Sequence, residues 1–78
     1  MIGFYLHARP LMHGRQVELR VFRGTRERPG TPHGALVFEP DEWEKFRVML
    51  IGGIRVAGYA RIPIEFMDGT WRKPDRLH

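Results

Sequence analysis

A period-two alternation in two N-terminal stretches constrains the fold of this chain more than any other sequence feature. In residues 2–9 and 16–23, apolar side chains recur at every second residue and therefore share one side, for example Val17 and Leu19. A period of two is typical of a β-strand with one buried face. A turn that contains proline and glycine separates the two stretches, so we predict that they form a β-hairpin.

A helical pattern appears farther along the chain. Pro40 suits the first turn of a helix, where the missing N–H costs nothing, and acidic residues beside it match the helix dipole. Trp43 and Phe46 begin an apolar stripe that repeats every three or four residues. The pair Gly52–Gly53 is a stop signal, so the pattern predicts a helix over about residues 40–51.

Two further segments are typical of strands and complete the expected fold. Residues 35–38 are apolar and residues 54–66 alternate, with Pro63 placing the second segment at a sheet edge or bulge. We therefore expect an α+β fold, a small antiparallel sheet of about four strands with one helix packed on one face. The expected organisation is a single domain over residues 1–69 and a basic C-terminal tail over residues 70–78.

The charge balance favours an anionic partner. Thirteen basic residues stand against nine acidic ones, and eleven of the thirteen are arginine. Four of the acids fall within residues 39–44, which leaves thirteen basic against five acidic residues elsewhere. Arginine pairs with phosphate through two parallel hydrogen bonds and stacks on bases, so this chain should attract polyanions. A GC-rich or thermophilic genome produces a similar excess of arginine.

The residue types in this chain do not suggest an enzyme, a metal or a cofactor. Cysteine and serine are absent, the four histidines show no paired metal-ligand spacing, and none of the common catalytic motifs occurs. The apolar N-terminal run is too short for a signal peptide or a membrane span, so we expect a cytoplasmic protein without a membrane partner. A 78-residue chain buries little surface, which favours a homodimer.

The predicted strands gather basic and aromatic side chains on the face opposite their apolar side, because residues two apart in a strand share a face. Two arginines of the loop over residues 24–34 join this set. The predicted nucleic-acid-binding residues are Tyr5, Arg9, Arg20, Phe22, Arg26, Arg28, Arg55, Tyr59 and Arg61, and His7 shares their face. In binders of single strands, bases stack on rings while cations follow the phosphates. We expect single-stranded DNA or RNA binding, in a transcription or replication accessory factor; an ordinary solvent face is the alternative.

A second function is compatible with the same sequence. Trp and Arg are enriched at the energetic centres of protein interfaces. Trp71, Arg72 and Lys73 would then anchor a small adaptor or phage-type regulator on an acidic surface of another protein, such as a polymerase subunit.

The run Val17-Glu18-Leu19-Arg20, the glycine-started run 34–37 and the helix start at residues 42–46 also match a known pattern. Over residues 17–50 the chain resembles the PC4 family of single-stranded-DNA-binding transcriptional coactivators. The resemblance implies a curved antiparallel sheet with a helix, dimerisation and single-strand binding. On the matched stretch it implies contacts from Arg20, Arg26 and Arg28. The strand predicted after the helix has no counterpart in the family's core module.

Overall fold

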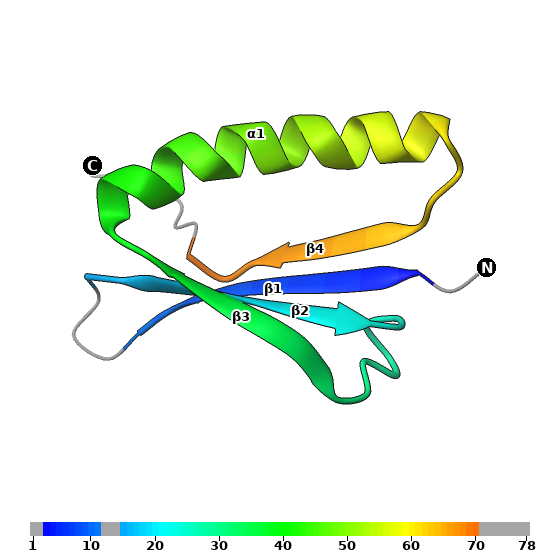
Figure 1. Cartoon of the computed structure of the whole chain (residues 1–78), viewed down its shortest axis with the longest axis horizontal. Coiled ribbons are helices and arrows are strands. Elements are labelled where there is room, and N and C mark those ends of the chain that lie inside the picture. The colour runs from blue at the N-terminus through cyan, green and yellow to red at the C-terminus, as the bar shows by residue number, and fades with distance from the viewer. Residues whose placement is uncertain (1–2, 12–14, 71–78) are drawn as a thin grey trace, which may run out of the picture.

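A computed structural model describes residues 3–11 and 15–70, which form a four-stranded sheet with one long helix lying along one face (Figure 1). The elements in chain order are β1 (Phe4–Pro10), β2 (Val17–Arg23), β3 (Pro32–Phe38), α1 (Pro40–Tyr59) and β4 (Ile64–Asp68). The strands lie side by side in the order β3-β2-β1-β4. The expected α+β class, with four strands and one helix on one face, is confirmed.

The predicted hairpin is present as β1 and β2, which pair antiparallel with Ala8 opposite Leu19. The backbone N–H of Leu11 donates to the carbonyl of Gln16 at 2.9 Å, and this hydrogen bond joins the two ends of the connection between the strands. β3 pairs antiparallel with β2 and begins at Pro32, three residues earlier than the sequence indicates.

The fourth strand corrects the expectation of an all-antiparallel sheet. β4 pairs with β1 in parallel, with Leu6 opposite Phe66. The helix explains this direction, because α1 returns the chain from the edge strand β3 to the other edge of the sheet. A strand that follows such a crossover starts again at the same end of the sheet and so runs parallel.

The helix is longer than predicted, and the strand predicted over residues 54–66 is wrong over most of its length. Gly52 and Gly53 lie inside α1, and the helix continues to Tyr59. A glycine inside a helix costs about 0.5–1 kcal/mol relative to alanine. Ile54 and Ala57, both partly buried, extend the side of the helix that faces the sheet. Their packing offsets the cost of the glycines, because tertiary contacts override local propensity.

The true helix end lies at the residues around Arg61. The N–H of Arg61 donates to the carbonyl of Gly58 at 3.0 Å, and the N–H of Ile62 donates to that of Ala57 at 2.9 Å. This pair of bonds defines a Schellman motif, which needs a left-handed residue after the cap. Arg61 takes that conformation, with a φ of 60°. An arginine therefore stands where glycine is usual, which hides the stop signal in the sequence.

The core lies between the sheet and the first half of α1. Its buried residues are Leu6, Ala8, Val17, Leu19 and Trp43. Aromatic rings surround them, with Phe38 stacked on Phe46 at 4.8 Å between ring centres and Trp43 edge-on to Phe66 at 6.4 Å. An ion pair between Arg47 of the helix and Asp68 of β4 closes the core on one side.

Candidate nucleic-acid interface

The sheet face opposite α1 brings together five residues that the sequence assigns to it. Along the β1–β2 register, Tyr5 lies opposite Phe22, His7 opposite Arg20 and Arg9 opposite Glu18. Leu6 and Ala8 alternate with the β1 residues of this set and are buried toward the helix. We call the face that holds Tyr5, His7, Arg9, Glu18, Arg20 and Phe22 the open sheet face.

The aromatic residues of the open sheet face contact one another. The rings of Tyr5 and His7 are nearly parallel, with 9° between their planes and 6.2 Å between their centres. Tyr5 also stacks on Phe22 at 5.5 Å. Phe22 is only 9% exposed, so its ring is part of the protomer's packing. Phe22 therefore has little ring surface to offer to a base, whereas Tyr5 and His7 are partly exposed.

A carboxylate at the Arg9 end of the open sheet face joins its two arginines. Arg9 and Arg20 donate from Nε to the Oε1 atom of Glu18 at 2.8 Å and 2.9 Å. The hydrogen bond from Arg9 is the main cause of a lowered Glu18 pKa; burial opposes it and Arg20 adds to it. One guanidinium has five N–H donors, so each ion pair occupies only part of one arginine. The trio has a net charge of about +1.

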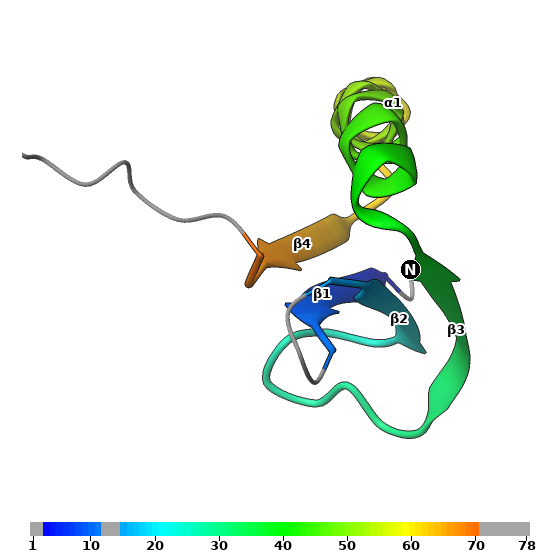
Figure 2. The same cartoon turned by 90° about the vertical axis from the view of Figure 1, so that its left-hand side faces the viewer.

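The loop over residues 24–31 forms a wall of the open sheet face, as Figure 2 shows beneath β1 and β2. The N–H of Gly24 donates to the carbonyl of Gly3 at 2.9 Å, and that of Arg26 donates to Glu65 Oε1 at 3.3 Å. Glu65 is the β4 register partner of Tyr5, so the loop crosses this end of the face. Arg26 and Arg28 are both exposed there.

Three predicted residues do not belong to the open sheet face. Arg55 and Tyr59 lie on α1 and Arg61 follows its end, so all three lie on the helix side of the sheet (Figure 1). Tyr59 is 83% exposed. The interpretation of residues 54–66 as a strand placed them wrongly, since a helix distributes its residues around an axis and not on two faces.

Sequence reasoning also missed the role of two acidic residues. Glu18 forms ion pairs with Arg9 and Arg20, and Glu65 accepts a hydrogen bond from the loop. Alternation along β2 places Glu18 on the same face as Arg20, two residues away, and this was the available signal. The contact between Glu65 and the loop has no such signal, because it joins residues 39 positions apart.

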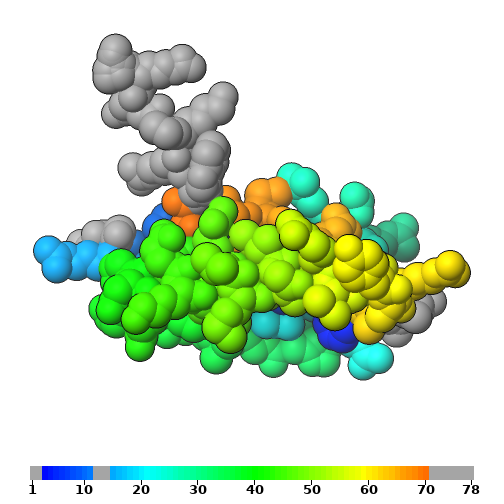
Figure 3. Space-filling model, turned by 90° about the horizontal axis from the view of Figure 1, so that it is seen from above, coloured from blue at the N-terminus to red at the C-terminus, as the bar shows by residue number. Residues whose placement is uncertain are grey.

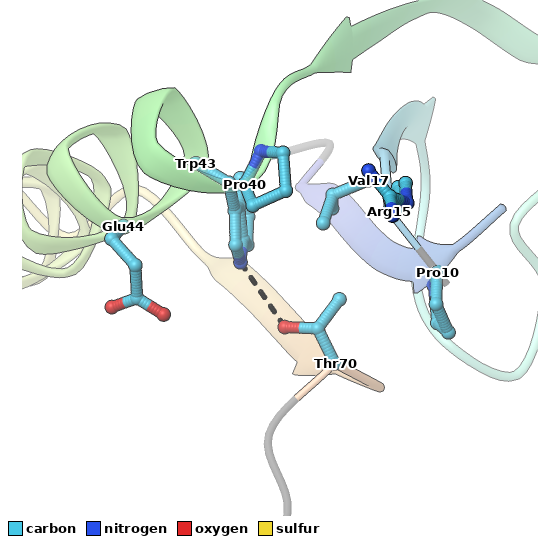
Figure 4. A pocket seen from close by; sticks show the side chains of 7 residues that line it. All are labelled: Pro10, Arg15, Val17, Pro40, Trp43, Glu44 and Thr70. Carbon is cyan, nitrogen blue, oxygen red and sulfur yellow. Dashed lines mark hydrogen bonds between the residues drawn. The ribbon is translucent and has the colours of Figure 1, made fainter. Parts of the chain in front are cut away.

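A pocket of about 420 Å³ lies on the other side of the sheet, at the start of α1 (Figure 4). Its lining residues are Pro10, Arg15, Val17, Pro40, Trp43, Glu44 and Thr70. Trp43 Nε1 donates to Thr70 Oγ1 at 3.1 Å, and Arg15 and Glu44 lie on opposite sides. The lining presents one cation and one anion and none of the nucleophile–base pairs that catalysis uses.

The remaining sequence expectations concern metals, membranes and the tail. Within residues 3–11 and 15–70, no three His, Asp or Glu residues lie close enough together to hold a metal ion. Over the same residues, no helix has the length and apolar character needed to cross a membrane. Trp71, Arg72 and Lys73, the anchor of the adaptor hypothesis, lie outside the described residues.

Comparison with known proteins gives no relative from which to assign a function. No protein-family model, no curated protein and no solved structure matches this chain significantly. The resemblance to the PC4 family therefore stays a prediction, and the site rests on its own geometry.

Proposed function

We propose that this chain is a cytoplasmic, non-enzymatic module that binds single-stranded DNA or RNA through its open sheet face. The observation that supports this most is the nearly parallel pair of Tyr5 and His7 beside Arg9 and Arg20, on the face that α1 leaves uncovered. Base–aromatic stacking contributes about 1–3 kcal/mol per base, and neighbouring arginines attract the phosphates. With such binding, the chain would serve as a transcription or replication accessory factor.

The exposed loop arginines extend the proposed path of the strand. Arg26 and Arg28 lie at the end of the face occupied by Tyr5, while Arg9 and Arg20 lie toward the middle and far end of β1 and β2. A single strand that stacks on Tyr5 and His7 then has cations on both sides. Phe22 stacks on the Tyr5 ring and makes no contact with a base in this proposal.

Fluorescence anisotropy tests the proposal with a labelled single strand of about 20 bases, longer than the roughly 4–16 nucleotides that one small module covers. The matching duplex and an RNA of the same sequence serve as competitors, each at low and near-physiological salt. The single strand should bind most tightly, with log affinity falling by about 0.7 per phosphate contact for each tenfold rise in salt. Equal binding of single strand and duplex that disappears with salt would leave only generic charge attraction and would overturn the proposal.

Matched variants separate the open sheet face from the rest of the surface. Tyr5→Leu keeps an apolar side chain against Phe22 but removes the stacking ring, so single-strand affinity should fall by about 1–3 kcal/mol. Tyr59→Leu makes the same chemical change on the exposed side of α1 and should leave affinity unchanged. Arg20→Gln and Arg55→Gln form a second pair for the charge. Equal losses within either pair would contradict binding at this face.

A further inference from the structure

From Val48 to its end at Tyr59, α1 exposes an apolar stripe to solvent. Val48, Met49, Val56 and Tyr59 are 68%, 70%, 66% and 83% exposed. Their spacing places them on one side of the helix, together with Gly52. Figure 3 looks down on α1, and no other described segment lies over this green-to-yellow surface. We define Val48, Met49, Gly52, Val56 and Tyr59 as the outer stripe.

We propose that the outer stripe binds the outer stripe of a second copy of this chain, with the two helices antiparallel and crossing at Gly52. This proposal goes beyond the nucleic-acid function, because α1 and the open sheet face lie on opposite sides of the sheet (Figure 1). A two-fold symmetric contact uses the same patch on both copies, so the stripe must complement itself.

The apolar residues of the stripe meet this requirement when the axis passes near Gly52. Val48 and Val56 lie four residues on either side of it, about 6 Å along the helix. In the antiparallel arrangement, Val48 of one copy therefore faces Val56 of the other. Met49 extends the same contact and fills irregular gaps through its unbranched side chain.

The charges next to the stripe complement themselves in the same arrangement. Glu44 lies eight residues before Gly52, about 12 Å along the helix, and Arg61 lies nine residues after Gly52, just beyond the helix end at Tyr59. Each glutamate thus approaches the arginine of the other copy. Lys45 and Tyr59 lie seven residues on either side of Gly52, which places an ammonium group over an exposed ring. A parallel pair would instead bring Glu44 against Glu44.

Gly52 itself provides an independent argument. A Cβ atom added at Gly52 meets nothing within 4 Å, so the protomer has no packing reason for a glycine there. The same is true of Gly53 and Gly58, but of these three helical glycines only Gly52 lies on the outer stripe. Glycine in a helix interior weakens the helix relative to alanine. A helix that crosses closely at this position supplies the missing reason, because absence of a side chain lets two backbones approach.

The protomer buries few hydrophobic side chains, and the apolar surface that it leaves exposed provides the driving force for association. Among the described residues, six hydrophobic side chains are buried and nine large ones are exposed. Burial of apolar surface is the dominant favourable contribution to most protein association. A contact between two helices is smaller than a standard interface, so we expect a reversible, concentration-dependent dimer.

Sedimentation equilibrium without nucleic acid tests the proposal over a wide concentration range. The wild-type mass should rise twofold, from one copy to two. Gly52→Glu places two carboxylates at the crossing point and should keep the mass of one copy throughout, with an unchanged circular dichroism spectrum. Gly58→Glu is the matched control, because Gly58 also has open space around its Cβ but lies outside the stripe, and it should dimerise like the wild type.

A charge exchange tests the antiparallel geometry. Glu44→Arg alone should weaken the dimer, and addition of Arg61→Glu in the same chain should restore it. A wild type that stays monomeric at the highest concentration, or a Gly52→Glu variant that still dimerises, would overturn the proposal. Failure of the double exchange to restore the dimer would overturn it as well. None of these results depends on nucleic-acid binding, so the two proposals fail separately.

Discussion

The two halves of α1 lie against very different surroundings. In the first half, Trp43 is 2% exposed and contacts aromatic rings from β3 and β4, and Arg47 pairs with Asp68. In the second half, apolar side chains such as Val56 and Tyr59 face solvent, and the last turn has no basic residue. The first half is thus part of the protomer's core, whereas much of the apolar surface of the second half is available to another molecule.

This contrast shows that hydrophobic residues in one helix can serve two purposes. Burial in the protomer needs residues on one side of the helix only. α1 follows that rule through Trp43, Phe46 and Leu50, and then adds apolar residues on the opposite side after Arg47. Measurements of stability in dilute solution distinguish the two purposes, because only the first contributes to the folding of a single copy.

The largest effect should come from Trp43→Ala, which removes the most buried side chain of the helix. Truncation of a buried Trp costs about 3–5 kcal/mol, a large part of the stability of a small domain. Tyr59→Ala, in the exposed half, should change the free energy of unfolding by less than about 0.5 kcal/mol. Urea denaturation of both variants measures the difference. Similar losses of stability in the two variants would contradict the contrast between the two halves of α1.

The ion pair of the first half should make stability depend on pH. Burial raises the pKa of Asp68, but hydrogen bonds from Thr70 and Arg47 outweigh it, so the pKa in the folded state is lower than usual. A lowered pKa means that the ionised carboxylate stabilises the fold above its unfolded pKa of about 3.9, and that this contribution is lost as the pH falls through the folded value.

Asp68→Asn tests this dependence. At neutral pH the variant should be less stable by about 1–3 kcal/mol, because the guanidinium of Arg47 loses its charged partner. The difference in the free energy of unfolding between the variant and the wild type should become smaller as the pH falls below about 4. Urea midpoints across this range provide the measurement. If the difference in stability stays constant with pH, the charge of Asp68 is not the cause of the stabilisation.

At the end of the exposed half, Arg61→Gly should stabilise the protomer. The left-handed conformation costs a non-glycine residue about 1–2 kcal/mol, and the greater freedom of glycine in the unfolded chain offsets part of the gain. The expected net change is about +0.5–1 kcal/mol in the free energy of unfolding. Thermal unfolding in dilute solution checks it, and a loss of stability would indicate contacts of the Arg61 side chain that outweigh its backbone strain.

A stabilisation of similar size should come from Gly53→Ala within the exposed half. A Cβ at this position meets nothing within 4 Å, and alanine is favoured over glycine in a helix by about 0.5–1 kcal/mol. A small gain in thermal stability should result. Destabilisation instead would show that this part of α1 is in closer contact with the protomer than its exposure indicates.

Much of the N-terminal half could be predicted from local patterns. Alternation places Val17 and Leu19 in the core and Tyr5 and Arg20 on the opposite face, and the register confirms both. Residues 54–61 could not be placed in this way. Val56 and Ala60 fit a strand period, whereas Leu50, Ile54 and Ala57 fit a helix period, and the glycine pair favoured the wrong choice.

The candidate site shows the same division between local and distant contacts. The face shared by Tyr5, His7 and Arg9 follows from spacing within one strand. The burial of Phe22 and the hydrogen bond from the loop to Glu65 depend on contacts between segments far apart in the sequence. Spacing alone contains no information about such contacts.

The sequence by itself determined the hairpin, the start of the helix at Pro40, the α+β class and the concentration of arginine, since each depends on neighbouring residues or on composition. Only the tertiary structure decided the length of the helix, the parallel direction of β4 and which apolar residues stay exposed. The physical reason is that these features depend on burial against distant segments, which offsets a local penalty such as that of Gly52 and Gly53.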